Sequence, residues 1–466
     1  MSESPCRDMS PGDFRRYGHE AVEWIAEFLE NVRDYPVLPP VKPGELTDSL
    51  PASAPETGEP MEALLRDFRE KIVPATTIWN HPRFFAYFSI SSSGPGILGE
   101  LLASALDVNG MLWKSSPAAT ELEQVTLGWL RQWLGLPDDF FGLIYDTASV
   151  SSMHAIAAAR ELAFPEVREN GGLSGAVMYC SEHAHSSIDK GAIALGIGHK
   201  NVRKVPVDAE FRMRPDALEQ MVEVDIAAGR KPFCVVATVG TTSTTSIDPV
   251  PDVAGIAERY GLWLHVDAAY AGSAAVIPEM RHILTGCERA DSLVTNPHKW
   301  LFTPVDVSVF YTRRPEVLRR AFSLVPEYLR TAEDPRAINL MDYGVQLGRR
   351  FRALKLWFVL RYFGHEGLAA ILRDHIAMAQ EFAGWVRADE RFELAAPVPF
   401  SLVCFRLRSG DEQNKMLMDA VNETGEAFLS HTVLNGRFAL RLAIGNIQTT
   451  REDIRTTWDL IRKLAG

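Results

Sequence analysis

The sequence predicts an α/β protein with a mainly parallel sheet covered by helices, a helical segment before it and a small α+β domain after it. Short, continuously apolar runs alternate with helix-length segments in the middle of the chain. Two amphipathic stripes joined by a proline-rich connector precede them, and alternating runs with a hairpin signal follow. The expected boundaries are 1–93 for the N-terminal segment, 94–354 for the large domain and 355–466 for the small domain.

Residues 1–93 carry two amphipathic helix candidates and no core of their own. Apolar side chains recur at helical spacing in both stripes, at Tyr17, Ala21, Val22, Ile25, Phe28 and Leu29 and again at Leu64, Leu65, Phe68 and Ile72. The prolines between them exclude a regular helix. Such stripes must pack on the rest of the chain or on a second copy of it, and we expect a second copy.

The middle region contains four clear apolar runs that we interpret as buried strands of a mainly parallel sheet. They are Phe233–Val239, Leu262–Val266, Ser292–Thr295 and Val307–Thr312. In sheets of this kind ligands bind at the carboxyl ends of the strands. That rule draws attention to the residues that closely follow these runs: Thr241, Asp267 and Lys299.

The last region changes character from about residue 355. Two helical stretches are followed by a strand candidate at Leu402–Arg408 and by a hairpin signal at Asn435–Gly436. The closing helix begins at Thr449 with Glu452 three residues later, which is typical of a capping box. These patterns predict a small α+β domain.

Composition narrows the class of protein. The 466-residue chain has a formal net charge of −12 and no block rich in Lys or Arg, which argues against nucleic acid or an anionic membrane as partner. No apolar run reaches the length of a membrane span, and the polar start carries no signal core. Its 5 cysteines are odd in number with no CxxC pair, so we expect reduced thiols and a cytoplasmic protein.

Two strand-end residues could carry chemistry together. Asp267 alone would be interpreted as a helix cap, and Lys299 alone as a surface lysine with a solvated amine. As a pair they favour a different interpretation, because a desolvated lysine has a lowered pKa and can form a Schiff base. A carboxylate facing a pyridine nitrogen keeps that nitrogen protonated, so the pair is the minimum apparatus for pyridoxal 5′-phosphate (PLP).

A phosphate site is the second requirement of PLP. Thr147, Ala148, Ser149, Ser151 and Ser152 precede an Ala-rich helix and could hold an anion at its N-terminus, although plain N-capping fits the same pattern. The segment "YCSEHAHSS" adds two histidines near a cysteine. Its spacing fits zinc poorly, so we expect no metal and favour an imidazole stacked on a cofactor ring, with a surface histidine as the alternative.

The chain closely resembles the PLP-dependent aromatic L-amino-acid decarboxylases, which include dopa, tryptophan and tyrosine decarboxylases. The resembling segments occur in the family's order along nearly the whole chain: "HPRFFAYF", "SPAATELE", "TAS", "YCSEHAHSS", "ATVGTTS", "WLHVDAAYAGSA", "NPHKWL", "LGRRFRALKLWFVLR" and "LVCFRL". The resemblance implies the aspartate aminotransferase-like fold (fold type I), a homodimer with active sites at the interface, and conversion of aromatic amino acids to arylalkylamines and CO2.

The resemblance also implies roles for individual residues. Lys299 would bind PLP covalently, Asp267 would pair with the pyridine nitrogen, and His185 would stack on the ring opposite Ala269. Tyr328, on a loop about two residues shorter than that of dopa decarboxylase, would be the proton donor. The remaining cofactor positions are Ala148 and Ser149 at the phosphate, Asn296 and His298 close to it, and Thr241 beside the ring.

Substrate choice rests on fewer positions. Trp79, Tyr87 and Phe88 match aromatic pocket positions, and Gly348 leaves room for a bulky ring, which favours tryptophan or a broad aromatic range. Two pocket positions depart from the family: Ile90 replaces a Thr near the phosphate, and Met111 stands where one subunit lends its partner an aromatic side chain.

Two alternatives stay open at this point. The first is a PLP-dependent aldehyde synthase. In related plant enzymes a Phe at the Tyr328 position accompanies aldehyde formation, so Tyr328 argues against this alternative. The second is a non-catalytic PLP-binding protein, which would require Lys299, Asp267, His185 and Tyr328 all to be idle.

Overall fold

The computed structural model describes residues 8–324 and 337–466. The chain divides into two compact units. The smaller unit comprises Met1–Phe84, Met416–Leu429 and Gln448–Gly466, and the larger comprises Phe85–Lys415 and Ser430–Ile447. The three-segment division predicted from the sequence stays a prediction.

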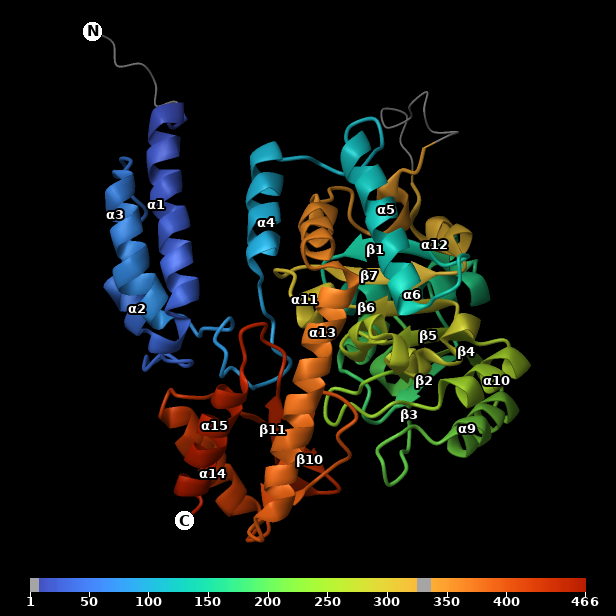
Figure 1. Ribbon diagram of the computed structural model, residues 1–466. Coiled ribbons are helices and arrows are strands. Elements are labelled where there is room, and N and C mark those ends of the chain that lie inside the picture. The colour runs from blue at the N-terminus through green and yellow to red at the C-terminus, as the bar shows by residue number, and fades with distance from the viewer. Residues whose placement is uncertain (1–7, 325–336) are drawn as a thin grey trace. The chain divides into compact units, whose positions relative to one another are not determined.

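A 7-stranded sheet forms the centre of the larger unit (Figure 1). Its order is β1-β7-β6-β5-β4-β2-β3, and β7 alone runs against its neighbours. This is the mainly parallel sheet that the sequence predicts. The strands are β1 (Phe141–Tyr145), β2 (Ala176–Ser181), β3 (Val202–Val205), β4 (Lys231–Thr238), β5 (Trp263–Asp267), β6 (Ser292–Thr295) and β7 (Ser308–Thr312).

Each face of the sheet has its own apolar core, because successive side chains of a strand point to opposite faces. On β5, Trp263 belongs to the cluster beneath α6 and α8, whereas Leu264 and Val266 belong to the cluster that includes α5, α10 and α13. The helices are α4 (Gly94–Leu106), α5 (Pro117–Leu134), α6 (Ala148–Ala163), α7 (Val167–Asn170), α8 (Ser187–Ala194), α9 (Pro215–Ala227), α10 (Val250–Tyr260), α11 (Pro297–Trp300), α12 (Pro315–Phe322) and α13 (Arg352–Ala388).

All four strands predicted in the middle region are present, with ends shifted by at most two residues. The sequence did not single out β1, β2 and β3. Of these, β3 is Val-Arg-Lys-Val with a half-buried centre, so it lacks the continuous apolar run by which the central strands are recognised.

A second sheet of 4 strands, in the order β10-β11-β9-β8, also belongs to the larger unit. Its hairpin turns at Asn435 and Gly436, which both have positive φ as a two-residue turn requires. The two predicted helical stretches form α13, which leaves helical geometry at Gly364 (φ 65°). The strands are β8 (Phe392–Leu394), β9 (Leu402–Leu407), β10 (Ser430–Leu434) and β11 (Arg437–Ala443), and α14 spans Asp411–Glu423.

The smaller unit contains the predicted N-terminal helices. Trp24 of α1 contacts Phe68 with ring centroids 4.8 Å apart, so the two stripes pack partly on each other. Apolar surface remains uncovered, since Phe14, Val22 and Leu64 are exposed. The elements are α1 (Pro11–Glu30), α2 (Glu45–Ser49), α3 (Met61–Asp67), a π-helical turn at Phe68–Ile72, and α15 (Arg451–Leu464).

The capping box of α15 lies one residue later than predicted. Thr450 is the N-cap, and its hydroxyl and backbone bond Asp453 reciprocally. The Thr449 hydroxyl instead donates to the carbonyl of Pro82 at 2.6 Å. Adjacent threonines make the two registers indistinguishable in the sequence, and tertiary contacts decide between them.

Two features bear on the predicted environment of the chain. Among the described residues, no helix has the length and apolarity that crossing a membrane requires. Cys180, Cys234, Cys287 and Cys404 are buried free thiols, whereas Cys6 lies outside the described residues. The cytoplasmic location stays a prediction.

A close approach of α4 to α13 gives a stability prediction. A Cβ on Gly99 would lie 2.7 Å from Lys355 Cα, which is backbone and cannot rotate away. Gly99→Ala should therefore lower the free energy of unfolding by about 1–3 kcal/mol. Gly128→Ala, in α5 with open space around it, should instead raise it by up to about 1 kcal/mol. Urea unfolding of both variants checks this, and equal stabilisation by both would contradict the close approach.

Candidate active site

Three parallel strands deliver the predicted catalytic residues to one edge of the sheet. In the register of β4, β5 and β6, Thr238 pairs with Asp267, and Asp267 pairs with Val294. Asp267 is thus the last residue of the central strand, while Thr241 follows β4 and Lys299 follows β6. The rule that ligands bind at the carboxyl ends of parallel strands therefore selects, from the sequence alone, segments that do lie at one edge of the sheet.

Lys299 lies in the short helix α11, and its amine is in a desolvated setting. Burial lowers its pKa, and the negative charge of Asp267 opposes that shift. Its Nζ also lies 5.5 Å from the centre of the Phe88 ring. A lowered pKa makes the neutral, nucleophilic amine more accessible near neutral pH, as covalent chemistry on a carbonyl group requires.

Backbone hydrogen bonds fix the surroundings of Asp267. Asp267 Oδ1 accepts the N–H of Ala269 at 3.1 Å, and the Ala269 carbonyl accepts the N–H of Asn296 at 3.0 Å. Asn296 is buried, yet its Oδ1 has no hydrogen-bond partner in the described part of the chain. An orphaned buried oxygen is costly, so this position suits a hydrogen-bonding ligand group.

Two histidines beside the site are held in one tautomer. His185 Nδ1 accepts the N–H of Ser187 at 3.2 Å, and His298 Nδ1 accepts the N–H of Val307 at 2.9 Å. Burial, reinforced by the charge of Lys299, lowers the pKa of His298 to about 3. Burial also lowers the pKa of His185, and Asp267 opposes that shift. Each ring is therefore neutral near neutral pH and carries its proton on Nε2.

The first turn of α6 is open to an anion. Its N-cap residue, Thr147, makes no side-chain hydrogen bond to the helix, so the N–H groups of Ala148 and Ser149 are not capped. Such a turn attracts negative charge.

Ser151 and Ser152 do not belong to this open turn. Both are fully buried within α6, where Ser151 bonds Ser308 at 2.8 Å and Ser152 bonds His265 at 3.1 Å. They fasten the helix to the sheet. The sequence interpretation that placed them before the helix was wrong, because α6 begins at Ala148.

Thr241 belongs to a buried hydroxyl chain whose direction is determined by its last member. Ser246 Oγ donates to the Glu210 carbonyl at 2.7 Å, so it must accept from Thr244 at 2.7 Å. Thr244 in turn accepts from Thr241 at 3.0 Å. The Thr241 hydroxyl proton is thus committed to Thr244, and its oxygen also accepts the N–H of Ser246 at 3.1 Å.

These features fit an anionic cofactor with a carbonyl carbon and a ring nitrogen. The open turn of α6 suits a phosphate, the desolvated Lys299 suits a covalent bond, and Asp267 suits a protonated ring nitrogen. The orphaned Asn296 Oδ1 and the His298 Nε2–H offer further polar contacts. The individual roles of these residues stay predictions.

The predicted pocket aromatics lie in different places. Phe88 stacks on Tyr270 with centroids 3.9 Å apart, and Tyr270 stacks on Trp300 at 4.7 Å. Phe88, Tyr270 and Trp300 thus form a stack of three rings that extends from the Lys299 amine into the core. Tyr87 is exposed, and Trp79 belongs to the smaller unit, where it stacks on Phe84 at 4.4 Å.

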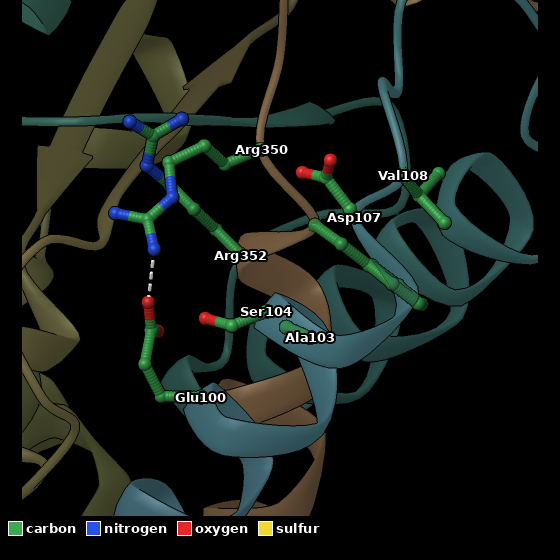
Figure 2. A pocket seen from close by; sticks show the side chains of 8 residues that line it. Glu100, Ala103, Ser104, Asp107, Val108, Arg350 and Arg352 are labelled. Atoms are coloured by element: carbon green, nitrogen blue, oxygen red, sulfur yellow. Dashed lines mark hydrogen bonds and ion pairs between the residues drawn. The ribbon is translucent and has the colours of Figure 1, made fainter. Parts of the chain in front are cut away.

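Met111 and Gly348 come together around Asn109. The Asn109 amide lies 3.8 Å from Met111 Sδ, and a Cβ on Gly348 would lie 3.8 Å from the same nitrogen. The adjoining residues line a pocket of about 150 Å³, where Arg350 pairs with Glu100 (Figure 2). Its lining residues are Glu100, Ala103, Ser104, Asp107, Val108, Arg350, Phe351 and Arg352. Of the predicted wall residues, Met111 and Gly348 thus lie near each other, beside this pocket but not among the residues that line it.

Arg441 is a charged residue near the site that the sequence interpretation missed. Its guanidinium is buried and donates to the carbonyls of Thr242 and Ser243 and to the Ser430 hydroxyl, all neutral groups. It lies 5.4 Å from the centre of the Phe88 ring, which Lys299 also approaches. Its positive field favours an anion nearby. The sequence does carry a signal for it, because an arginine inside an otherwise apolar run, "FALRLAI", is expected to be buried.

Two further predictions concern the proton donor and a metal ion. Tyr328, the predicted proton donor, lies outside the described residues. In residues 8–324 and 337–466, no three His, Cys, Asp or Glu side chains are grouped so as to hold a metal ion.

Comparison with known proteins decides the family. A model of the pyridoxal-dependent decarboxylase conserved domain matches residues 43–408. The chain belongs to the pyridoxal-dependent decarboxylase family. It is 41% identical to an aromatic-L-amino-acid decarboxylase of Catharanthus roseus over 100% of this chain and 96% of that one. It is 40% identical to a phenylacetaldehyde synthase of Arabidopsis thaliana over 99% and 97% of the two chains.

A solved structure of Oryza sativa TDC with PLP and tryptamine superposes with a TM-score of 0.96 at 40% identity, covering 99% of each chain. The family, fold class, enzyme class and cofactor predicted from the sequence are thereby confirmed. PLP is the cofactor of this decarboxylase, and the site described above contains groups that fit its phosphate, ring nitrogen and aldehyde.

Buried neutral histidines give a prediction about acid stability. Burial lowers the pKa of His154 and His298 to about 3 and of His265 and His375 to about 4. Between these values and about 6.5 the unfolded chain binds protons that the folded chain does not, so stability falls as the pH falls. Each histidine contributes a slope of up to about 1.4 kcal/mol per pH unit.

His375→Gln should reduce this acid loss while keeping an acceptor for the indole N–H of Trp300. Between about pH 7.5 and about pH 5.5, its unfolding free energy should fall by about 1.4 kcal/mol less than that of the unaltered chain. His282→Gln, at an exposed position, is the control and should not reduce the loss in this way. Urea unfolding at the two pH values measures the difference, and identical losses in all three proteins would contradict a neutral buried His375.

Proposed function

We propose that the enzyme decarboxylates aromatic L-amino acids, with tryptophan among them, to the corresponding arylalkylamines and CO2. The reaction predicted from the sequence agrees with the names of its relatives, an aromatic-L-amino-acid decarboxylase and a rice TDC solved with PLP and tryptamine. The observation that carries the proposal is the desolvated Lys299 amine next to Asp267 at the carboxyl edge of the sheet.

The chain's own residues have separable tasks in this reaction. When bound, PLP supplies an electron sink for the carbanion left by loss of CO2. Asp267 would keep the ring nitrogen protonated, and the neutral, exposed His185 ring could lie flat against a cofactor ring without adding charge. Lys299 would hold the cofactor through its desolvated amine. Arg441 adds positive potential for the substrate carboxylate, and orientation of the breaking bond supplies much of the rate.

Side-chain selection is proposed to depend on Gly348, Met111, Tyr87, Phe88 and Trp79. Gly348 has no side chain, and a Cβ built there would already make van der Waals contact with the Asn109 amide at 3.8 Å, so any larger residue would take up room that glycine leaves to a substrate ring. Aromatic and thioether side chains suit the faces of planar rings.

The second candidate is an aldehyde synthase, in which decarboxylation is followed by oxidative deamination. A phenylacetaldehyde synthase is among the relatives at 40% identity, so overall similarity does not separate the two reactions. Tyr328 favours amine formation, with the tyrosine as proton donor to the substrate carbon.

Product analysis distinguishes the two reactions. Incubation with tryptophan, tyrosine, phenylalanine and dopa should yield amine and CO2, without stoichiometric aldehyde, ammonia or peroxide. Lys299→Ala should abolish the cofactor that borohydride fixes to the chain and abolish turnover. Stoichiometric aldehyde and ammonia would contradict the decarboxylase proposal, and full turnover by Lys299→Ala would contradict the role of the lysine.

We also propose that the enzyme works as a homodimer with its active sites at the interface. One face of α4 exposes Leu98, Leu101, Leu102 and Leu106, each between 47% and 61% accessible. A contiguous apolar stripe of this kind marks an interaction surface on a soluble protein. The exposed stripe of α1 is a second such surface, as the sequence predicts, and a second copy of the chain is the proposed occupant of both.

Leu101→Glu should weaken the dimer, because a carboxylate would be buried in an apolar interface. We expect a rise of at least about tenfold in the dimer dissociation constant, measured by sedimentation equilibrium. Val224→Glu is the matched control, since Val224 is 62% exposed on α9 and away from the stripe. A chain that is active as a monomer, or a Leu101→Glu variant as dimeric as the control, would contradict the proposal.

A further inference from the structure

The residue before the open turn of α6 explains why that turn is open. Thr147 is the N-cap, and a threonine there ordinarily accepts from the N–H groups of the first turn. Here its hydroxyl is turned toward Asp146, to whose Oδ1 it donates at 3.0 Å, its backbone N–H bonds the same oxygen, and its own oxygen accepts no N–H of the helix. Asp146 thus holds the capping side chain away from the helix, which leaves the N–H groups of Ala148 and Ser149 for an anion.

The other carboxylate oxygen of Asp146 is held by a distant segment. Gln346 Nε2 donates to Asp146 Oδ2 at 3.1 Å. Without that contact the carboxylate could rotate, and the Thr147 hydroxyl would be free to cap its own helix. A self-capped turn would compete with a phosphate for the same N–H groups.

Gln346 also lies two residues from Gly348, in a segment that is bonded along its length to β1 and α6. The Tyr343 carbonyl accepts from the Tyr145 hydroxyl, and the Val345 N–H donates to His154 Nε2 at 3.2 Å. The segment ends at Arg349, and the side-chain contacts of Arg349 are more deeply buried than the contacts of Val345 and Gln346.

Arg349 forms a buried ion pair with Glu123 at 2.9 Å and donates to the Ile144 carbonyl at 2.7 Å. Glu123 accepts the N–H of Ile144 at 2.9 Å as well, and the Arg349 N–H donates to Asn109 Oδ1 at 3.0 Å. The end of β1, which leads into the phosphate turn, is therefore bonded to the wall formed by Met111 and Gly348.

We propose that Asp146 and Gln346 are positioning residues that keep the first turn of α6 uncapped for the PLP phosphate and connect it to the pocket wall carrying Gly348. The connection to substrate rests on the function proposed above, whereas the effect on PLP does not. Neither residue touches the reacting atoms. Loss of the hydrogen bond between Asp146 and Gln346 should weaken PLP binding. In the loaded enzyme it should raise the KM for the amino acid more than it lowers kcat.

The test exchanges donor and acceptor. Gln346→Glu keeps the shape of the side chain but sets a carboxylate against that of Asp146, and it should raise the PLP dissociation constant of the apoenzyme about tenfold. In an Asp146→Asn background the new amide can donate to the new carboxylate, while its oxygen still accepts from Thr147. There the same Gln346→Glu change should alter the constant by less than about twofold.

PLP absorbance and fluorescence titrations of the apoenzyme measure these constants without turnover, so they stand even if no aromatic amino acid is decarboxylated. Gln132→Glu, which adds a charge at an exposed position of α5, is the control and should leave PLP binding unchanged. Gln346→Leu, a neutral change of similar size, should shift the constant in the same direction as Gln346→Glu but by a smaller factor. An equal effect of Gln346→Glu in both backgrounds, or no effect in the unaltered chain, would overturn the proposal.

Discussion

The buried amine of Lys299 beside the carboxylate of Asp267 is the interaction on which the rest of the site depends. Burial lowers the pKa of the lysine, and Asp267 limits that shift, so the amine stays reactive without becoming an isolated buried charge. The register of β4, β5 and β6 brings the two residues to the same edge of the sheet. The apolar cores on both faces hold that register, and so the chemistry depends on the packing of the sheet.

Few of the titratable side chains around this pair carry a charge. His185 and His298 lie close to Lys299 but are neutral, because each Nδ1 already accepts a backbone N–H and burial lowers both pKa values. Arg441 is buried, and within the described part of the chain its guanidinium donates to carbonyl and hydroxyl oxygens only. Together with the open turn of α6, this arrangement favours anionic groups on a cofactor and a substrate without neutralising them in advance.

Much of this arrangement could be predicted from the sequence, because it depends on local patterns. Continuous apolar runs mark the central strands, and the residues after them, Asp267 and Lys299, follow from the carboxyl-edge rule. The hairpin at Asn435–Gly436 is a local signal of the same kind.

What could not be predicted depends on partners far apart in the chain. The sequence does not say that Ser151 and Ser152 bond the sheet or that Arg441 bonds the carbonyls of Thr242 and Ser243, since these partners lie more than 100 positions away. Nor does it say that the Thr147 hydroxyl is turned toward its neighbour Asp146. The N-cap of α15 is a further example, because the sequence predicts Thr449 at a position that Thr450 occupies in the structure.

The reversed direction of β7 has a consequence for how the chain can vary. Because β7 runs antiparallel to β6, the chain returns from Lys299 straight into the neighbouring strand, without a crossover helix. The connection 296–307 is also bonded across itself, from the Val307 N–H to His298 Nδ1. An insertion there would move the lysine relative to Asp267 with no slack to absorb it. A change of length is therefore better accommodated in other connections of the sheet than in this one.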